Sequence, residues 1–88
     1  RYGGEEFLVV MSGAAAEDGR LVAERLRNAV ASVPVHAEGQ TLNVTASIGY
    51  AVGDIGTPCD DVVSAADAAL YRAKNNGRNR VEAAQPQD

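Results

Sequence analysis

Residues 42–52 have the sequence LNVTASIGYAV, and apolar side chains occupy every second position of this stretch: Val44, Ala46, Ile48 and Tyr50. The positions between them hold the small or polar residues Thr45, Ser47 and Gly49. Successive side chains of a β-strand point to opposite faces of its sheet. The stretch therefore predicts a central strand with one apolar face.

The residues before this strand predict a second strand and a helix. The apolar run at 7–11 predicts a buried strand, entered through a glycine turn at residues 3–4. Residues 17–32 carry apolar side chains at helical spacing, and Pro34 ends this helix. Residues 35–40 predict a short extended piece and a turn. The expected inward face of the helix comprises Leu21, Val22, Leu26, Ala29, Val30 and Val33.

A helix of about 18 residues is predicted after the central strand. Its start is indicated by Thr57 as N-cap and Pro58 at the first helical position, and its end by a left-handed turn at residues 76–77. Residues 80–83 predict a last strand. The expected inward face comprises Val62, Val63, Ala66, Ala69, Leu70 and Ala73. This order of elements favours an α+β two-layer sandwich, with helices on one sheet.

The composition of the 88 residues limits the class of protein. Twelve acidic residues against eight basic ones give a net charge of -4, which argues against nucleic acid as a partner. No apolar run approaches the roughly 20 residues that span a bilayer, so no membrane contact by this segment is expected. The single cysteine, Cys59, fits a reducing compartment, and a cytoplasmic location is expected, with the parent protein free to be anchored through upstream segments. Only 5% of the residues are aromatic, which predicts a thin core.

The basic residues are concentrated in one short segment. Half of all Lys and Arg residues fall within nine positions that contain no acid: Arg72, Lys74, Arg78 and Arg80. Lys74 and Arg78 are four positions apart, with Gly77 bending the chain between them, so both can reach one small anion such as a triphosphate. The alternative is the common enrichment of basic residues at the C-terminus of a helix, where they complement its dipole.

Two consecutive carboxylates, Glu5 and Glu6, directly follow Gly3 and Gly4. A glycine turn leaves the backbone open to a ligand, and carboxylates are the ligands that Mg²⁺ prefers. The alternative is a surface hairpin with solvated acids. The chain has no P-loop and no GxGxxG motif, so any nucleotide is expected to be held by side chains and this turn.

Four other residues with reactive or polar groups are interpreted as structural. His36 has no triad partner placed by the sequence, and Cys59 has no functional neighbour. Tyr71 is expected to pack, and Arg25 to lie with its stem on the apolar edge of the first helix and its head in solvent.

Three separated segments together resemble the GGDEF family of diguanylate cyclases, in its GGEEF form. They are RYGGEEF at residues 1–7, VTASIG at 44–49, and ADAALYRAK at 66–74 running into Gly77-Arg78-Asn79. Their order and separation match the family from the first residue to about Glu82. Any one of them alone would be a weak signal.

The resemblance implies an α+β fold of the nucleotidyl-cyclase and ferredoxin-like type, in which helices form a two-layer sandwich with an antiparallel-type sheet. It also implies that two GTP molecules condense to cyclic di-GMP with release of pyrophosphate. The implied cofactor is Mg²⁺ or Mn²⁺, and the implied partner is a second GGDEF domain in a homodimer.

The family's motif assigns roles to the residues around the glycine turn. Glu5 occupies the position of a metal-binding carboxylate that helps to activate the attacking hydroxyl. Glu6 occupies the second acidic position of the catalytic motif. Gly3 and Gly4 correspond to glycines that let the substrate lie against the backbone.

The same comparison covers the basic segment and the extent of the domain. Lys74 and Arg78 match residues that contact the triphosphate, and Arg25 is a candidate for a secondary product contact. The family's domain is longer and begins with a strand that carries another metal-binding aspartate, so residues 1–83 are interpreted as its C-terminal half and 84–88 as a tail. The family's Arg-x-x-Asp product-inhibition motif would fall upstream.

Two alternatives to a cyclase remain open. One is a non-catalytic GGDEF-type module that binds GTP or cyclic di-GMP, or that dimerises. The other is a small ferredoxin-like interaction domain. For the 88 residues by themselves, we expect no cyclase activity, and we expect an exposed sheet edge that is covered by self-association.

Overall fold

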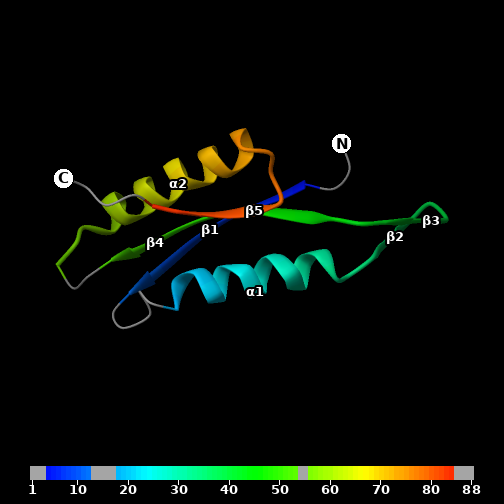
Figure 1. Ribbon diagram of the computed structural model, residues 1–88, viewed down its shortest axis with the longest axis horizontal. Helices are drawn as coiled ribbons and strands as arrows, with labels where there is room; N and C mark the ends of the chain where they lie inside the picture. Colours follow the sequence, from blue (N-terminus) through cyan, green and yellow to red (C-terminus); the bar gives the residue numbers. More distant parts are fainter. Residues whose placement is uncertain (1–3, 13–17, 54–55, 85–88) are drawn as a thin grey trace.

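The computed structural model describes residues 4–12, 18–53 and 56–84. Two helices and five strands follow one another along the chain (Figure 1). They are β1 (Gly4–Ser12), α1 (Gly19–Ala31), β2 (Val35–Ala37), β3 (Gln40–Leu42), β4 (Thr45–Gly53), α2 (Cys59–Asn75) and β5 (Arg80–Ala83).

The main sheet has the strand order β1-β4-β5, and both pairings are parallel. Gly4 is level with Thr45, and Ser47 is level with Arg80. The expectation of an antiparallel-type sheet is therefore wrong. A helix lies between each pair of successive strands of this sheet and returns the chain to the same end, which makes neighbouring strands parallel.

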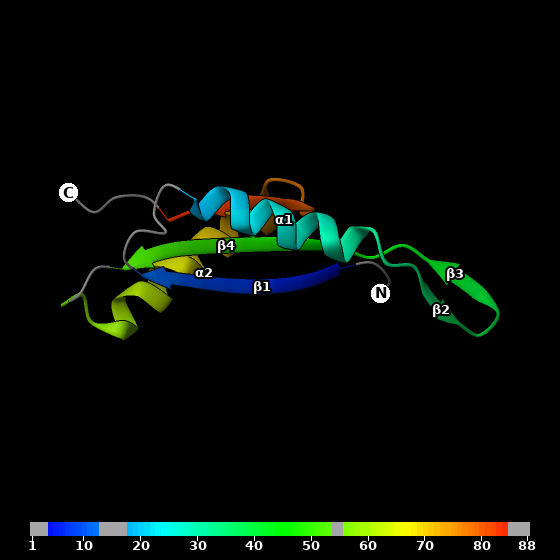
Figure 2. The same ribbon diagram turned by 90° about the horizontal axis from the view of Figure 1, so that it is seen from below.

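The two helices cover opposite faces of the sheet, as Figures 1 and 2 show. Ala46 and Ile48 of β4 pack with Ala23 of α1, whereas Ala51 packs with Val62 and Ala66 of α2. The molecule thus has three layers, and the expected two-layer sandwich with both helices on one face is wrong. The connection from β1 to β4 contains α1, and the connection from β4 to β5 contains α2; both move across the sheet in the same direction. Because the two helices lie on opposite faces, the two connections have opposite handedness.

Gly49 explains how closely α2 approaches the sheet. A Cβ atom at this position would collide with the backbone of α2 at Ala66 and Leu70. The small residues that alternate with Ala46 and Ile48 in β4 therefore allow α2 to pack closely on the opposite face of the sheet.

The core is thin, as the composition predicts. Ile48 is the largest fully buried side chain among the described residues, and most of the other buried apolar residues are alanines. Ala66, Ala69, Leu70 and Ala73 of α2 are buried as expected, but Val63 is exposed. In α1 the partly buried core contacts are Leu26 and Val30, whereas the other predicted inward residues are exposed: Leu21, Val22, Ala29 and, just beyond the helix, Val33.

Several element boundaries differ from the expectation. The strand expected at 42–52 begins at Thr45, because residues 40–42 pair with 35–37 in a separate hairpin whose turn residues Glu38 and Gly39 have φ of 53° and 76°. The N-cap of α2 is Pro58, not Thr57, and its carbonyl oxygen accepts hydrogen bonds from the backbone of the first turn. Neither described helix is long and apolar enough to cross a membrane.

Candidate functional site

The start of β1 and the end of α2 meet in a cluster of one acid and two basic residues. The Lys74 Nζ lies 3.3 Å from Glu6 Oε1, and an Arg78 guanidinium nitrogen lies 3.7 Å from Glu6 Oε2. The side chains are 42% exposed for Glu6, 31% for Lys74 and 43% for Arg78. Lys74 and Arg78 therefore converge on one carboxylate of the chain itself, and their binding of a small anion from solution stays a prediction.

Glu5 and Glu6 point to opposite faces of the sheet. Both belong to β1, which begins at Gly4, so the expectation that they lie in a turn is wrong. Glu6 is level with Ser47 on the α2 face, whereas Glu5 is level with Ala46, whose side chain packs against α1. The strand alternation therefore separates two carboxylates that are adjacent in the sequence.

Of the two glycines predicted to contact substrate, Gly3 lies outside the described residues, and Gly4 is the first residue of β1. The backbone of Gly4 is thus level with Thr45 at the same end of the sheet as the Glu6 cluster.

The C-terminal end of α2 places Lys74 and Arg78 side by side. Asn76 is the C-cap, and Gly77 has a φ of 122°. The Gly77 N–H donates to the Lys74 carbonyl at 3.4 Å, and the Arg78 N–H donates to the Ala73 carbonyl at 2.9 Å. These two bonds are those of a Schellman motif, so the predicted left-handed turn is confirmed.

The alternative explanation of the basic residues, complementing the helix dipole, holds in part. Arg72 and Lys74 lie in the last turn of α2. Arg72, however, donates a hydrogen bond of 2.6 Å to the Ala83 carbonyl of β5. It therefore joins the helix to the neighbouring strand.

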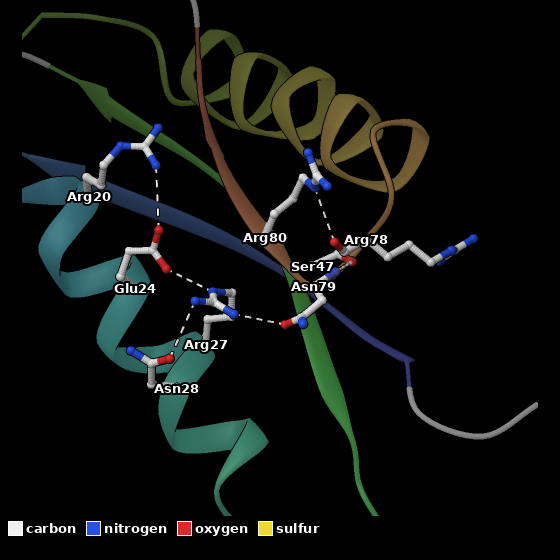
Figure 3. Close-up of polar contacts among 8 residues, drawn as sticks. All are labelled: Arg20, Glu24, Arg27, Asn28, Ser47, Arg78, Asn79 and Arg80. Atoms are coloured by element: carbon white, nitrogen blue, oxygen red, sulfur yellow. Dashed lines mark hydrogen bonds and ion pairs between the residues drawn. The ribbon is translucent and has the colours of Figure 1, made fainter.

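The turn at residues 77–79 is also held by the sheet and by α1, which sequence reasoning did not predict. The Asn79 N–H donates to Ser47 Oγ at 3.2 Å, and an Arg27 guanidinium nitrogen donates to Asn79 Oδ1 at 2.9 Å. Figure 3 shows Arg27 reaching across to this turn from α1. Ser47 and Asn79 lie within the family motifs quoted above, whereas no sequence signal singles out Arg27.

The remaining candidates lie apart from this cluster. Arg25 is exposed on α1, on the other side of the sheet from α2. His36 lies in the small hairpin, 3.2 Å from Thr41 Oγ1, and Cys59 is exposed with a free thiol. Tyr71 is 64% exposed, so the expectation that it packs is wrong.

Of the two carboxylates in the glycine motif, Glu5 is the one without a basic partner among the described residues and so can bind a divalent cation. Glu5 is exposed, and Glu6 is paired with two basic residues. Within residues 4–12, 18–53 and 56–84, no group of three or more His, Cys, Asp or Glu side chains could hold a metal ion. Mg²⁺ is commonly held by one or two carboxylates together with phosphates and water. Glu5 thus fits as a single ligand, not as a complete site.

Comparison with known proteins gives a consistent result. Residues 1–80 match the family described as "Diguanylate cyclase, GGDEF domain". The chain is 44% identical over 84 residues to "Diguanylate cyclase DgcP" of Pseudomonas aeruginosa, covering 96% of this chain and 12% of that protein. It is 43% identical over 82 residues to "Diguanylate cyclase A" of Treponema denticola, covering 92% of this chain and 22% of that protein.

A third relative is the "Response regulator PleD" of Caulobacter vibrioides, which is 45% identical over 85 residues, covering 92% of this chain and 18% of that protein. The chain therefore spans less than a quarter of the length of each of these relatives. No solved structure gives a significant match.

Proposed function

This chain belongs to the GGDEF diguanylate cyclase family, and on that premise we propose that it forms part of a catalytic domain that condenses two GTP molecules to cyclic di-GMP. Pyrophosphate is the second product. In this proposal Lys74 and Arg78 hold the triphosphate of GTP, and Gly3 and Gly4 let the nucleotide lie against the backbone. The second GTP is supplied by another GGDEF domain in a homodimer.

The observation that carries the proposal is the convergence of two basic residues on one carboxylate. Lys74 and Arg78 lie within 3.3 Å and 3.7 Å of the two oxygens of Glu6. A triphosphate carries more negative charge than one carboxylate and offers oxygens of similar spacing, so it can take the place of Glu6 between them.

Arg78 also has hydrogen-bonding capacity left over. One of its guanidinium nitrogens is buried and donates no hydrogen bond to any described residue, because Glu6 at 3.7 Å is too far away. A buried donor without an acceptor is costly, and a phosphate oxygen would satisfy it.

The acids have different roles in this proposal. Glu5, on the face opposite to Lys74, contributes one carboxylate toward Mg²⁺ or Mn²⁺, and Glu6 is the counterion that the triphosphate displaces. The cation, when bound, neutralises charge on the reacting phosphates. Lys74 and Arg78 stabilise the negative charge that accumulates on the leaving pyrophosphate. Arg25 remains a candidate for a secondary contact with the product.

The proposal is tested by an assay of the parent protein with GTP and Mg²⁺, in which cyclic di-GMP is measured by mass spectrometry. We expect Lys74→Ala and Arg78→Ala each to lower kcat/KM by about tenfold to a hundredfold, the range for loss of one charge-assisted hydrogen bond. Arg20→Ala is the matched control, because it removes the same charge from an exposed position on the other face. Equal activity of all four proteins would overturn the proposed role of the basic pair.

Two further comparisons separate a cyclase from a non-catalytic module. Glu5→Gln in the parent protein is expected to abolish synthesis, whereas a module that only binds nucleotide would keep its regulatory effect. The 88-residue chain assayed beside the parent is expected to be inactive, because within its described residues no group of three or more His, Cys, Asp or Glu side chains could hold a metal ion. Synthesis of cyclic di-GMP by this chain alone would contradict that expectation.

A further inference from the structure

We propose that Arg27 and Ser47 are positioning residues for the triphosphate site, acting through the turn at residues 77–79. They hold Asn79 from two sides and so fix the direction in which Arg78 leaves the turn. The inference rests on the proposed function, because it assigns a purpose to the placement of Arg78.

The turn needs support because its backbone is unusual. Gly77, Arg78 and Asn79 have φ values of 122°, 63° and 47°, so three successive residues are left-handed. Glycine accepts such a conformation and asparagine tolerates it, but for arginine it costs on the order of 1 kcal/mol. Conformations of this kind persist where surrounding contacts determine them, and they gather at functional sites.

Two hydrogen bonds supply this support at Asn79. Its backbone N–H donates to Ser47 Oγ at 3.2 Å, and Ser47 is 3% exposed in the middle strand of the sheet. Its side-chain oxygen accepts a hydrogen bond of 2.9 Å from Arg27. The contact with Ser47 thus fixes the backbone of Asn79, the residue after Arg78, and the contact with Arg27 fixes the Asn79 side chain.

Arg27 is itself held in place. Its Nε donates to Glu24 Oε1 at 2.8 Å, one turn earlier in α1, and its side chain is 24% exposed. Figure 3 shows Arg27 and Arg78 on opposite sides of the turn, so Arg27 does not reach the anion site directly. Its effect on that site therefore passes through Asn79.

The geometry links the two faces of the sheet. Arg27 belongs to α1, whereas Lys74 and the start of the turn belong to the end of α2 on the other face. Ser47 lies in β4 between them, level with Glu6 of β1. The orientation of Arg78 toward Glu6 is thus determined by elements on both sides of the sheet.

The first test measures the turn without any ligand. In the 88-residue chain, amide hydrogen exchange of Asn79 reports its bond to Ser47. We expect Ser47→Ala and Arg27→Gln to accelerate this exchange by about tenfold, the equivalent of one hydrogen bond of ordinary strength. Arg20→Gln is the matched control, because Arg20 has the same charge and, among the described residues, pairs with Glu24 at 3.7 Å and not with the 77–79 turn.

The second test measures the anion site with inorganic triphosphate as the probe, by calorimetry and without metal. Ser47→Ala and Arg27→Gln are expected to raise the dissociation constant by about tenfold, with Arg20→Gln unchanged. In an Arg78→Ala background, Arg27→Gln should cause no further loss, because its effect passes through Arg78. If Arg27 only stabilised the fold, Arg27→Gln would lower the melting temperature, and its loss of triphosphate affinity would add to the loss caused by Arg78→Ala.

The outcomes separate this inference from the proposed function. If the unmodified chain binds triphosphate and Arg27→Gln binds it equally well, the positioning role is wrong and the anion site stands. Unchanged exchange at Asn79 in both variants also overturns the positioning role. If the unmodified chain binds no triphosphate, or if Arg78→Ala binds it unchanged, the proposed anion site is wrong and the inference fails with it.

Discussion

Glu5 and Glu6 are adjacent in β1, and the strand directs their side chains to opposite faces of the sheet. Glu6 lies within ion-pair distance of two basic residues, whereas Glu5 faces the α1 side of the sheet. A motif with two consecutive acids in a strand therefore cannot present both to the same ligand from the same face. The acid that compensates the basic pair and the acid available to a metal are different residues.

This separation predicts opposite behaviour of the two acids toward a polyphosphate. Glu6→Gln removes the carboxylate that competes for Lys74 and Arg78, so inorganic triphosphate should bind more tightly. We expect an increase in affinity of about threefold, because exposed ion pairs contribute little free energy. Calorimetry without divalent metal measures the effect, and it should shrink at high salt. Glu5→Gln is the control and should leave the affinity unchanged. Weaker binding of triphosphate to the Glu6 variant would show that Glu6 organises the site instead of competing for it.

The ends of the elements show which features the sequence can predict. The left-handed end of α2 at Gly77 depends on local backbone preferences, and its prediction is confirmed. The pairing of β1 with β4 depends on residues about 40 positions apart in the chain, and the predicted strand direction is wrong. The sequence pattern places Lys74 and Arg78 together, because four residues at a helix end set their distance. It does not reveal Arg27, because contacts between α1 and the 77–79 turn exist only after folding.

Gly77 sets the path of the chain as it leaves α2. Gly77→Ala forces a side chain onto a φ of 122° and should lower the free energy of unfolding by about 1–2 kcal/mol. Because Gly77 precedes Arg78, the affinity for inorganic triphosphate should also fall. Gly56→Ala is the control, since Gly56 also has a positive φ, of 102°, and no atom of the described residues within 4 Å of the added Cβ, but lies before α2 begins at Cys59. Urea unfolding and calorimetry would measure both variants.

Equal losses of triphosphate affinity in the two glycine variants would contradict this account. They would show that general loosening of α2, and not the path of the 77–79 turn, controls the anion site. Loss of affinity in Gly77→Ala alone supports the link between helix ending and binding.

The whole molecule is elongated and has little buried apolar volume. Its extents are 50, 23 and 18 Å, and the β2–β3 hairpin projects from one end (Figure 2). Within the described residues, β1 pairs only with β4, so its other edge is unpaired. Leu8 and Val10 on this strand are exposed, together with Val63 and Tyr71 of the helix that covers the same face. An unpaired strand with apolar side chains is a template for pairing with another chain.

We therefore expect the 88-residue chain to self-associate as its concentration rises, through β1. Val10→Lys places a charge on the unpaired strand, a common natural protection against edge pairing, and should shift the mass measured by sedimentation toward the monomer. Val33→Lys is the control, because Val33 is also exposed but lies after α1, away from the edge. If both variants associate like the unmodified chain, the contact lies elsewhere on the surface. A monomer at all concentrations would show that the β1 edge is protected without a partner, which its side chains give no reason to expect.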